Sequence, residues 1–564
     1  MQTPLLLRHT QASPAAALNA LEKRGAVYTR PWIVELILDM AGYDERADLA
    51  DRLAVEPAAG EGAFLVPMAL RLVRSARLKG KEPLECQGSL IAFEVDGESA
   101  AVARASVAQA LAREGVPKAE AKTLVSRWIR VGDYLTEAPG LPRADFVVGN
   151  PPYVRLEGVP ADLAGFYRAT YPTMKGRADL YVAFFEAALR QLKDGGVCSF
   201  ICADRWMLNH YGGELRRLVT SEYAVDAVVE MHNADAFVSE VSAYPAMTVI
   251  RRAAQRSTLV ASVGRDAMKD GRALARCLLK TAGGEAARLP GGVSAARVST
   301  WFRGQDPWPR TSPERLALLK DLEERFQPLE SKETRTRVGI GVATGADKVF
   351  ITRDESVVEE SRLLPLAMAS DITTGVLQWS GRYLVNPWGE EGLVDLSRYP
   401  RLKAYLGRHK EALKRRHVAR RNGRSWARTI DRVNSPLTGR PKLYIADIKD
   451  RLRPVLDRGE TYPHHNLYFV QSDGWDLEVL GGLLLSDVAQ FFVECYGVKM
   501  RGGYLRFQAQ YLRRIRVPTP DQVTAEQSER LRRAFRARDA EDATASTLAV
   551  YGIDGVPPEV RGGY

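Results

Sequence analysis

An asparagine followed by two prolines and a tyrosine, Asn150 to Tyr153, comes directly after the apolar run Phe146 to Gly149. Each proline lacks a backbone N–H and has a fixed φ, so this segment cannot continue a helix or a central strand. The sequence therefore predicts a buried strand that ends in a rigid loop. The Asn150 side-chain oxygen and the Pro151 carbonyl are two acceptors beside the ring of Tyr153. This set suits a planar group that carries an NH2, such as a nucleobase amine, whereas the alternative interpretation is a plain proline turn.

Other apolar runs also end in polar residues. Leu53 to Val55 precedes Glu56, Ser89 to Phe93 precedes Glu94, and Trp128 to Val131 precedes Gly132 and Asp133. In parallel α/β sheets, ligands bind outside the carboxyl ends of the strands. The series predicts a Rossmann-like α/β domain with its binding site at that edge. Further strands are expected at 197–202, 225–230 and 246–250, and helices at 32–41, with Thr29 as N-cap, and at 179–193.

The turn between Glu56 and Phe64 contains Gly60 and Gly62 but lacks the third glycine of the dinucleotide fingerprint. An acid at the strand end repels a pyrophosphate and attracts a cation. The turn therefore favours a cofactor with an ammonium or sulfonium centre over NAD. Glu94, at the end of the next strand, is well placed to accept hydrogen bonds from both ribose hydroxyls of a nucleoside.

Positive charge is concentrated in one part of this chain. The net charge is +11, and residues 401–453 contain 17 Lys or Arg against four acids, which gives 17 − 4 = +13. A cluster of this kind attracts a polyanion, and nucleic acid is the partner it favours. A solvated basic helix face is the alternative. We expect phosphate contacts from Arg408, Lys414, Arg415, Arg416, Arg420, Arg421 and Arg424.

The five cysteines are scattered and form no CxxC pair, so neither a disulfide framework nor a structural zinc site is indicated. Cys198 and Cys202 lie in an apolar run and are expected in the core. The sequence shows no signal peptide and no membrane-spanning run, and we expect a cytoplasmic protein.

A length of 564 residues suggests two to four domains. The pattern changes after Arg252, and new strands are expected at Val338 to Gly345 and at Val349 to Ile351. We predict a catalytic domain at 1–252, a connecting region at 253–335, a recognition domain at 336–520 and a charged, helical tail at 521–564.

Taken together, these motifs resemble the gamma class of AdoMet-dependent DNA adenine-N6 methyltransferases, the TaqI-like modification enzymes of type II restriction-modification systems. The resemblance covers most of residues 25–250 and, more loosely, 335–520, with a C-terminal α+β target-recognition domain. It implies a catalytic loop from Asn150 through Pro151 and Pro152 to Tyr153, with Phe237 as a second aromatic holding a flipped base. It implies that AdoMet is held by Tyr28, Thr29, Glu56, Pro57, Ala58, Gly60, Gly62, Phe64, Glu94, Asp133, Tyr134 and Pro152.

In such an enzyme, the two acceptors of the loop bind both hydrogens of the adenine amine, so that its lone pair can attack the sulfonium methyl without a metal or a covalent intermediate. The family implies double-stranded DNA as substrate, a possible cognate endonuclease on a separate chain, and protection of host DNA. We expect a monomer that does not bind membranes. The alternatives are an NPPY methyltransferase that acts on RNA or protein, and a non-catalytic DNA-binding subunit.

Overall fold

The protein was analysed as a computed structural model, which describes residues 28–232, 234–238, 245–283, 286–309, 311–421, 425–434, 437–497 and 504–558. These residues form two compact units, divided between Ala317 and Leu318. The described part of the chain up to Ala317 is called unit 1, and Leu318–Pro557 is called unit 2. Each unit is described by itself.

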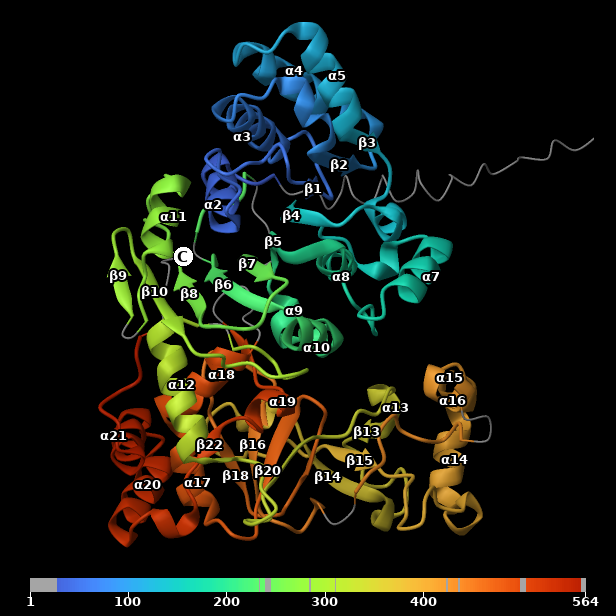
Figure 1. Cartoon of the computed structure of the whole chain (residues 1–564). Helices are drawn as coiled ribbons and strands as arrows, with labels where there is room; N and C mark the ends of the chain where they lie inside the picture. Colours follow the sequence, from blue (N-terminus) through green and yellow to red (C-terminus); the bar gives the residue numbers. More distant parts are fainter. Residues whose placement is uncertain are drawn as a thin grey trace, which may run out of the picture. The chain divides into compact units, whose positions relative to one another are not determined.

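Unit 1 is built on a ten-stranded sheet with the order β3-β2-β1-β4-β5-β7-β6-β8-β10-β9 (Figure 1). The strands β1 to β5 are mutually parallel, and β7 is antiparallel to both β5 and β6. The chain moves outward from β1 to β3 and then returns to β4 on the other side of β1, which makes the carboxyl ends of β1 and β4 a topological switch point. The bounds are β1 Ala54–Glu56, β2 Leu90–Glu94, β3 Ile129–Val131, β4 Ala144–Gly149, β5 Leu192–Ala203, β6 Ala224–Glu230, β7 Pro245–Arg251, β8 Thr258–Ser262, β9 Ala287–Leu289 and β10 Val293–Val298.

Helices cover both faces of this sheet. Neighbouring residues of β1 point to opposite faces, so that Ala54 belongs to one hydrophobic core and Val55 to the other. The first core contains α2 Pro31–Ala41, α3 Leu65–Leu78, α4 Gly97–Arg113, α5 Lys118–Trp128 and α11 Gly271–Leu279. The second contains α6 Tyr134–Glu137, α7 Ala161–Thr170, α8 Tyr181–Gln191, α9 Arg205–Leu208 and α10 Gly213–Glu222. The predicted Rossmann-like α/β domain is confirmed, and Cys198 and Cys202 are buried in it as expected.

The sheet extends beyond the predicted end of the catalytic domain at residue 252. Strands β8 and β10, from the segment expected to be a connecting region, pair with β6 and with each other. Helix α11, from the same segment, packs against α2. This segment therefore completes unit 1, because β8 adds to the open edge that β6 would otherwise expose.

Unit 2 contains two four-stranded sheets. The first has the order β12-β20-β16-β18, and the second has the order β13-β15-β14-β19. The segment expected as a strand at 349–351 is mostly the helical turn α13 Asp347–Phe350, followed by β13. The strand bounds are β12 Arg337–Ile340, β13 Ile351–Thr352, β14 Leu363–Ala367, β15 Tyr383–Val385, β16 Lys442–Ala446, β18 Val455–Asp457, β19 Tyr462–Pro463 and β20 Leu467–Gln471. Two short pairs, β11 Gln327–Pro328 with β22 Arg516–Val517 and β17 Ile448–Lys449 with β21 Leu505–Arg506, complete it.

The C-terminal segment expected to be a separate tail belongs to unit 2 up to Pro557. It forms α20 Ala525–Ala537 and α21 Ala540–Tyr551, and α20 packs on α17 Leu477–Leu485. The Arg532 guanidinium pairs with Asp476, the N-cap of α17, at 2.8 Å. Among the described residues no single helix is long and apolar enough to cross a membrane, and α17 with α18 Asp487–Tyr496 meets the test only as a pair bent by 63°.

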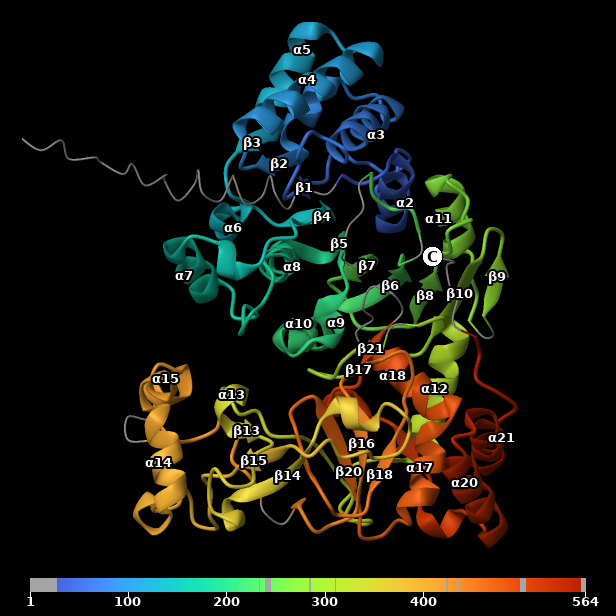
Figure 2. The ribbon, with the colours of Figure 1, turned by 180° about the vertical axis from the view of Figure 1, so that it is seen from behind.

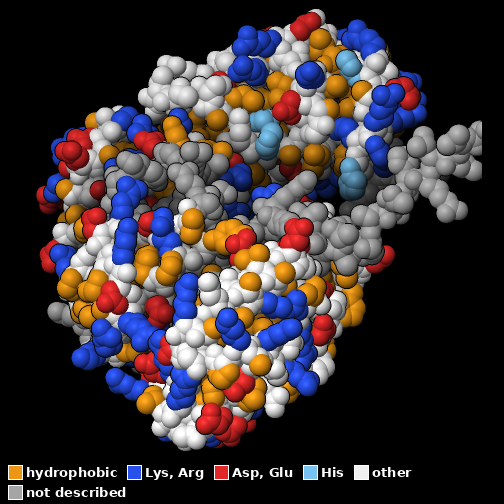
Figure 3. Space-filling view, turned by 90° about the horizontal axis from the view of Figure 1, so that it is seen from above, with side chains coloured by type: hydrophobic (Ala, Val, Ile, Leu, Met, Phe, Trp, Pro, Cys, Tyr) orange, Lys and Arg blue, Asp and Glu red, His pale blue; other side chains and the backbone are white. Residues whose placement is uncertain are grey.

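The first part of the predicted basic segment, up to residue 421, forms three short helices, α14 Pro400–Arg408, α15 Lys410–Lys414 and α16 His417–Arg421. Figures 1 and 2 both show these helices at one end of unit 2, with α20 and α21 at the other. We call α14 to α16 the basic arm. Positive charge is not confined to it, because Figure 3 shows Lys and Arg side chains over much of the face that it draws, with Asp and Glu side chains between them.

Candidate functional site

A pocket of about 510 Å³ in unit 1 lies at the carboxyl ends of β1, β2 and β4. Most of the residues singled out in the sequence meet there. Its lining contains Tyr28, Thr29, Glu56, Ala58, Ala59, Gly60, Glu61, Ala63, Phe64, Glu94, Asp96, Glu98, Ser99, Val102, Asn150, Pro151, Pro152 and Tyr153. The turn after β1 and the loop after β4 thus form parts of one pocket.

The turn after β1 is held in place by its glycines. Gly60 has a φ of +53° and donates its N–H to Oε2 of Glu94 at 2.7 Å. Gly62 has a φ of +97°, and a Cβ at this position would lie 3.4 Å from Ala103 of α4. A larger residue at Gly62 would therefore combine backbone strain with close contact to the helix. Both glycines let the turn run close to α4 and to the end of β2.

Two carboxyl groups lie in the floor of this pocket. Glu56 is 1% exposed, and its Oε2 has no hydrogen-bond partner among the described residues. Burial raises the pKa of Glu56 well above its ordinary value, and the neighbouring Glu94 raises it further. Burial also raises the pKa of Glu94, although hydrogen bonds from the backbone of Asp96 and Gly60 oppose the shift. A ligand that donates hydrogen bonds or carries positive charge would stabilise both groups in their ionised form.

The loop after β4 presents its amide in a defined orientation. Nδ2 of Asn150 donates to Oγ1 of Thr29 at 3.2 Å, so the amide oxygen is turned away from that hydroxyl. Thr29 is not the N-cap of α2 as predicted: the cap position is Arg30, which makes no side-chain cap hydrogen bond. Thr29 instead forms a β-bridge with Phe237. Its hydroxyl positions Asn150 rather than the helix.

Phe237 contacts the pocket residue Tyr153 and does not itself line the pocket. The two ring centroids are 6.2 Å apart, and the planes meet at 83° in an edge-to-face contact. Phe237 is buried and stands outside the pocket lining. The Arg30 side chain donates to its carbonyl at 3.1 Å, and the backbone of Arg30 donates to Ala236 at 3.0 Å. The segment that carries Phe237 is therefore fastened to the segment that carries Thr29.

Like Phe237, four predicted cofactor-binding residues lie outside the pocket lining: Pro57, Gly62, Asp133 and Tyr134. Asp133 caps α6 through the N–H of Leu135 and accepts the hydroxyl of Tyr167 at 2.8 Å. Tyr134 is 1% exposed and stacks on Phe184, with its hydroxyl on Gln191. Both side chains thus have structural partners.

The structure adds pocket residues that the sequence reasoning missed. Glu61, Asp96, Glu98, Ser99 and Val102 line the wall formed by the turn and by α4. Asp96 accepts from the N–H and the hydroxyl of Ser99, and Glu61 accepts from the hydroxyl of Tyr28 at 3.1 Å. The sequence pattern that could have predicted this wall is Asp96 three residues before Ser99, which is typical of a helix N-cap. Here the helix starts directly after the end of a strand.

The predicted phosphate-contacting residues differ in exposure. Arg408, Lys414, Arg415 and Arg420 are exposed on the basic arm. Arg416 instead donates to the carbonyls of Leu413, Thr344, Trp426 and Arg428, and burial lowers its pKa. The side chain of Arg421 and all of Arg424 lie outside the described residues.

Comparison with known proteins identifies the family. The model of the Eco57I restriction-modification methylase family matches residues 142–237, which include the Asn150 loop and Phe237. The type II methyltransferase M.PaeR7I of Pseudomonas aeruginosa is 43% identical over 556 residues, covering 97% of this chain and 95% of that protein. The type II methyltransferase M.XhoI of Xanthomonas vasicola is 43% identical over 543 residues, covering 94% and 98%. In fold, the chain is similar to the type IIL restriction-modification enzyme MmeI, solved in complex with DNA, with a TM-score of 0.54, 13% identity and coverage of 98% and 76%. The chain therefore belongs to the type II DNA methyltransferases of restriction-modification systems.

Proposed function

We propose that this methyltransferase transfers the methyl group of AdoMet to N6 of an adenine in double-stranded DNA. The observation that carries the proposal is the single pocket shared by the buried acids Glu56 and Glu94 and by the Asn150 loop. A cationic nucleoside and an amine acceptor would thus bind side by side. The modification would protect host DNA from a cognate endonuclease on a separate chain.

The pocket fits AdoMet in its chemistry. The unpartnered Oε2 of Glu56 suits the ammonium group or the sulfonium charge, and Glu94 suits the ribose hydroxyls. Tyr28, Thr29 and Phe64 supply further pocket wall. When bound, AdoMet supplies an electrophilic methyl group. We leave Asp133 and Tyr134 out of the proposed contacts, because their side chains are engaged elsewhere.

The Asn150 loop would activate the target amine. The lone pair of an aromatic amine is delocalised into the ring, which makes the nitrogen a poor nucleophile. Asn150 accepts one N–H hydrogen through its side-chain oxygen, and the Pro151 carbonyl accepts the other. Both hydrogen bonds favour a tetrahedral nitrogen and localise its lone pair. The hydrogen bond from Asn150 to Thr29 holds the amide ready before substrate arrives, so catalysis is mainly positioning and electrostatics.

An adenine inside a duplex cannot reach this pocket, so the base must be flipped out of the stack at a cost of a few kcal/mol. Stacking on Tyr153 offsets about 1–3 kcal/mol of that cost. Phe237 would hold the other face. Because the two rings stand at 83° in the structure, one ring has to turn before a base can lie between two parallel faces.

The exposed cations of the basic arm would contact DNA phosphates, with Arg408, Lys414, Arg415 and Arg420 as the contacting residues. Such contacts carry affinity without sequence information. The methyltransferase would act as a monomer.

The test is the identity of the methylated base. Plasmid DNA from a methylation-free host that expresses the protein would be digested to nucleosides and analysed by mass spectrometry, with the Asn150→Ala variant as control. We expect N6-methyladenine with the wild type and none above background with the variant. Methylcytosine in place of N6-methyladenine would refute the adenine assignment.

A further inference from the structure

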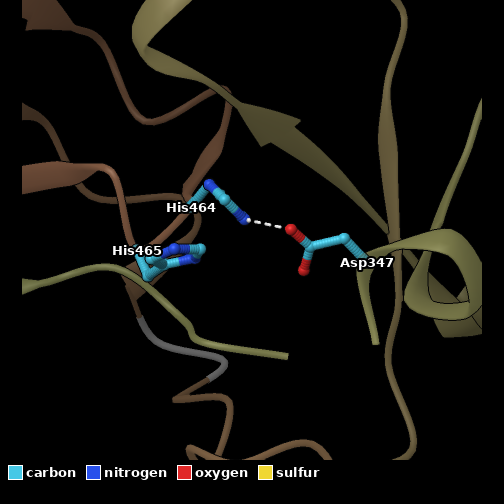
Figure 4. Close-up of side chains that lie close together, drawn as sticks. All are labelled: Asp347, His464 and His465. Atoms are coloured by element: carbon cyan, nitrogen blue, oxygen red, sulfur yellow. Dashed lines mark hydrogen bonds and ion pairs between the residues drawn. The ribbon is translucent and has the colours of Figure 1, made fainter. Parts of the chain in front are cut away.

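Three potential metal ligands meet in unit 2, far from the methyl-transfer pocket in sequence. Asp347 is the first residue of α13, and His464 and His465 directly follow β19. One donor atom from each side chain lies within 4.8 Å of the others (Figure 4). Asp347 and His464 are 117 residues apart, so the fold of unit 2 brings them together.

The backbone holds His464 firmly in place. Its N–H donates to Ala367 at 3.0 Å, and its side chain is 4% exposed. The N–H of His465 donates to Val342 at 3.0 Å, and Val342 donates to Pro463 at 2.9 Å. A Cβ at Gly341 would lie 2.2 Å from the His464 carbonyl, so only glycine fits there. The segment at Gly341 and Val342 is therefore tightly joined to the segment that carries the histidines.

The side chains are arranged as metal ligands usually are. Nε2 of His464 lies 3.3 Å from Oδ2 of Asp347, and Oγ1 of Thr344 donates to the other carboxylate oxygen. An imidazole binds a metal ion through the lone pair of a ring nitrogen. The exposed His465 ring lies 4.0 Å from the His464 ring. Two imidazoles and a carboxylate are a common ligand set for zinc.

The distances between the three donor atoms show which side chain would have to move for zinc to bind. Zinc binds nitrogen and carboxylate oxygen at about 2.0–2.2 Å, so two ligands of one ion lie at most about 4 Å apart. The contact of His464 with Asp347 already meets this limit. His465 is exposed, and its donor atom lies within 4.8 Å of the other two, so this side chain would have to move closer for all three to bind one ion.

We propose that Asp347, His464 and His465 bind one divalent transition-metal ion, with Zn²⁺ as the ion that fits best. Three protein ligands leave a fourth position for water or another ligand. The ion joins the start of α13 to the connection between β19 and β20, and so fixes two segments of unit 2 that are far apart along the chain. This site is independent of the methyl-transfer pocket.

The experiment uses the full-length chain without an affinity tag, because a histidine tag would bind the ion itself. After treatment with EDTA, the protein is dialysed against Zn²⁺ and its metal content is measured. We expect one Zn²⁺ per chain in the wild type. His465→Ala should weaken binding by more than about tenfold, and Asp347→Asn should have a similar effect.

The matched control is His417→Ala, which removes an exposed histidine of the basic arm in the same unit. It should bind Zn²⁺ like the wild type. Zn²⁺ should also raise the melting temperature of the wild type and of His417→Ala, but not that of His465→Ala. Both readouts are independent of methylation activity. Equal affinity in His465→Ala and His417→Ala, or no stoichiometric binding by the wild type, would overturn the proposal.

Discussion

The pocket of unit 1 and the basic arm of unit 2 place their charged side chains in opposite ways. In unit 1, Glu56 is buried at the end of β1, and burial raises the pKa values of both Glu56 and Glu94. In unit 2, Arg408, Lys414 and Arg415 extend from short helices into solvent. A buried charged group interacts strongly with one ligand group. Exposed charges each add a small attraction for the ligand, and salt screens that attraction. Changes in unit 1 should therefore affect chemistry and cofactor affinity sharply, and changes in the basic arm should affect DNA affinity gradually.

The largest effect is expected at Asn150. Asn150→Ala removes one of the two amine acceptors and should lower the single-turnover rate of methyl transfer by about 10²- to 10³-fold, as for the loss of one oxyanion-hole donor. AdoMet affinity should change little, because the partner that we propose for Asn150 is the target amine and not the cofactor. Incorporation of labelled methyl groups measures the rate, and calorimetry measures AdoMet binding. Asn209→Ala, in a different loop of unit 1, is the control. Near-normal turnover in Asn150→Ala would show that the Asn150 side chain is not needed to bind the target amine.

Glu56→Gln should weaken AdoMet binding by about 10- to 100-fold, the equivalent of about 1.4 kcal/mol per factor of ten. It should also stabilise the cofactor-free protein at high pH. The pKa of Glu56 is raised on folding, so the folded state holds this proton more strongly than the unfolded state. The contribution of Glu56 to the free energy of unfolding is then largest below the ordinary pKa of a glutamate. It is lost as the pH rises through the raised pKa of the folded state.

Thermal unfolding of wild type and Glu56→Gln between pH 4 and pH 9 checks the pH dependence. The difference between the two proteins should be small at pH 4 and grow with pH. Glu82→Gln, at an exposed acid of unit 1, is the control. A wild type that gains stability relative to Glu56→Gln as pH rises would contradict the proposed environment of this acid.

A smaller effect is expected at Tyr153. Tyr153→Ala removes a stacking face worth about 1–3 kcal/mol and should lower methylation by roughly tenfold or more. Tyr153→Phe keeps the ring face, and the hydroxyl it loses has no hydrogen-bond partner among the described residues. That variant should keep most of its activity. Initial rates at saturating AdoMet separate the two, and equal loss in both variants would argue against stacking.

The sequence predicted unit 1 well, because each site element lies within a few residues of a strand end. Glu56 and Glu94 are the last residues of β1 and β2, Asn150 directly follows β4, and the pocket lies at the carboxyl ends of these strands. Asp133 has the same kind of position after β3, yet its partner Tyr167 comes from α7, so local pattern could not show that it is engaged. The proposed metal site could not be predicted from local pattern either, because it contains no cysteine pair and Asp347 is 117 residues from His464 along the chain.

The smallest effect is expected at two neighbouring arginines of the basic arm. Arg415 is exposed, whereas Arg416 donates to four backbone carbonyls. Arg415→Ala should weaken DNA binding severalfold and reduce the slope of log affinity against log salt by about 0.9, without lowering stability. Arg416→Ala should leave that slope unchanged but lower the melting temperature, because it leaves buried carbonyls unpaired. DNA binding measured at several salt concentrations, together with thermal unfolding, separates the two effects. If Arg416→Ala changed the salt slope as Arg415→Ala does, charge on this arm would act as one field, and the distinction between a supporting and a DNA-contacting arginine would fail.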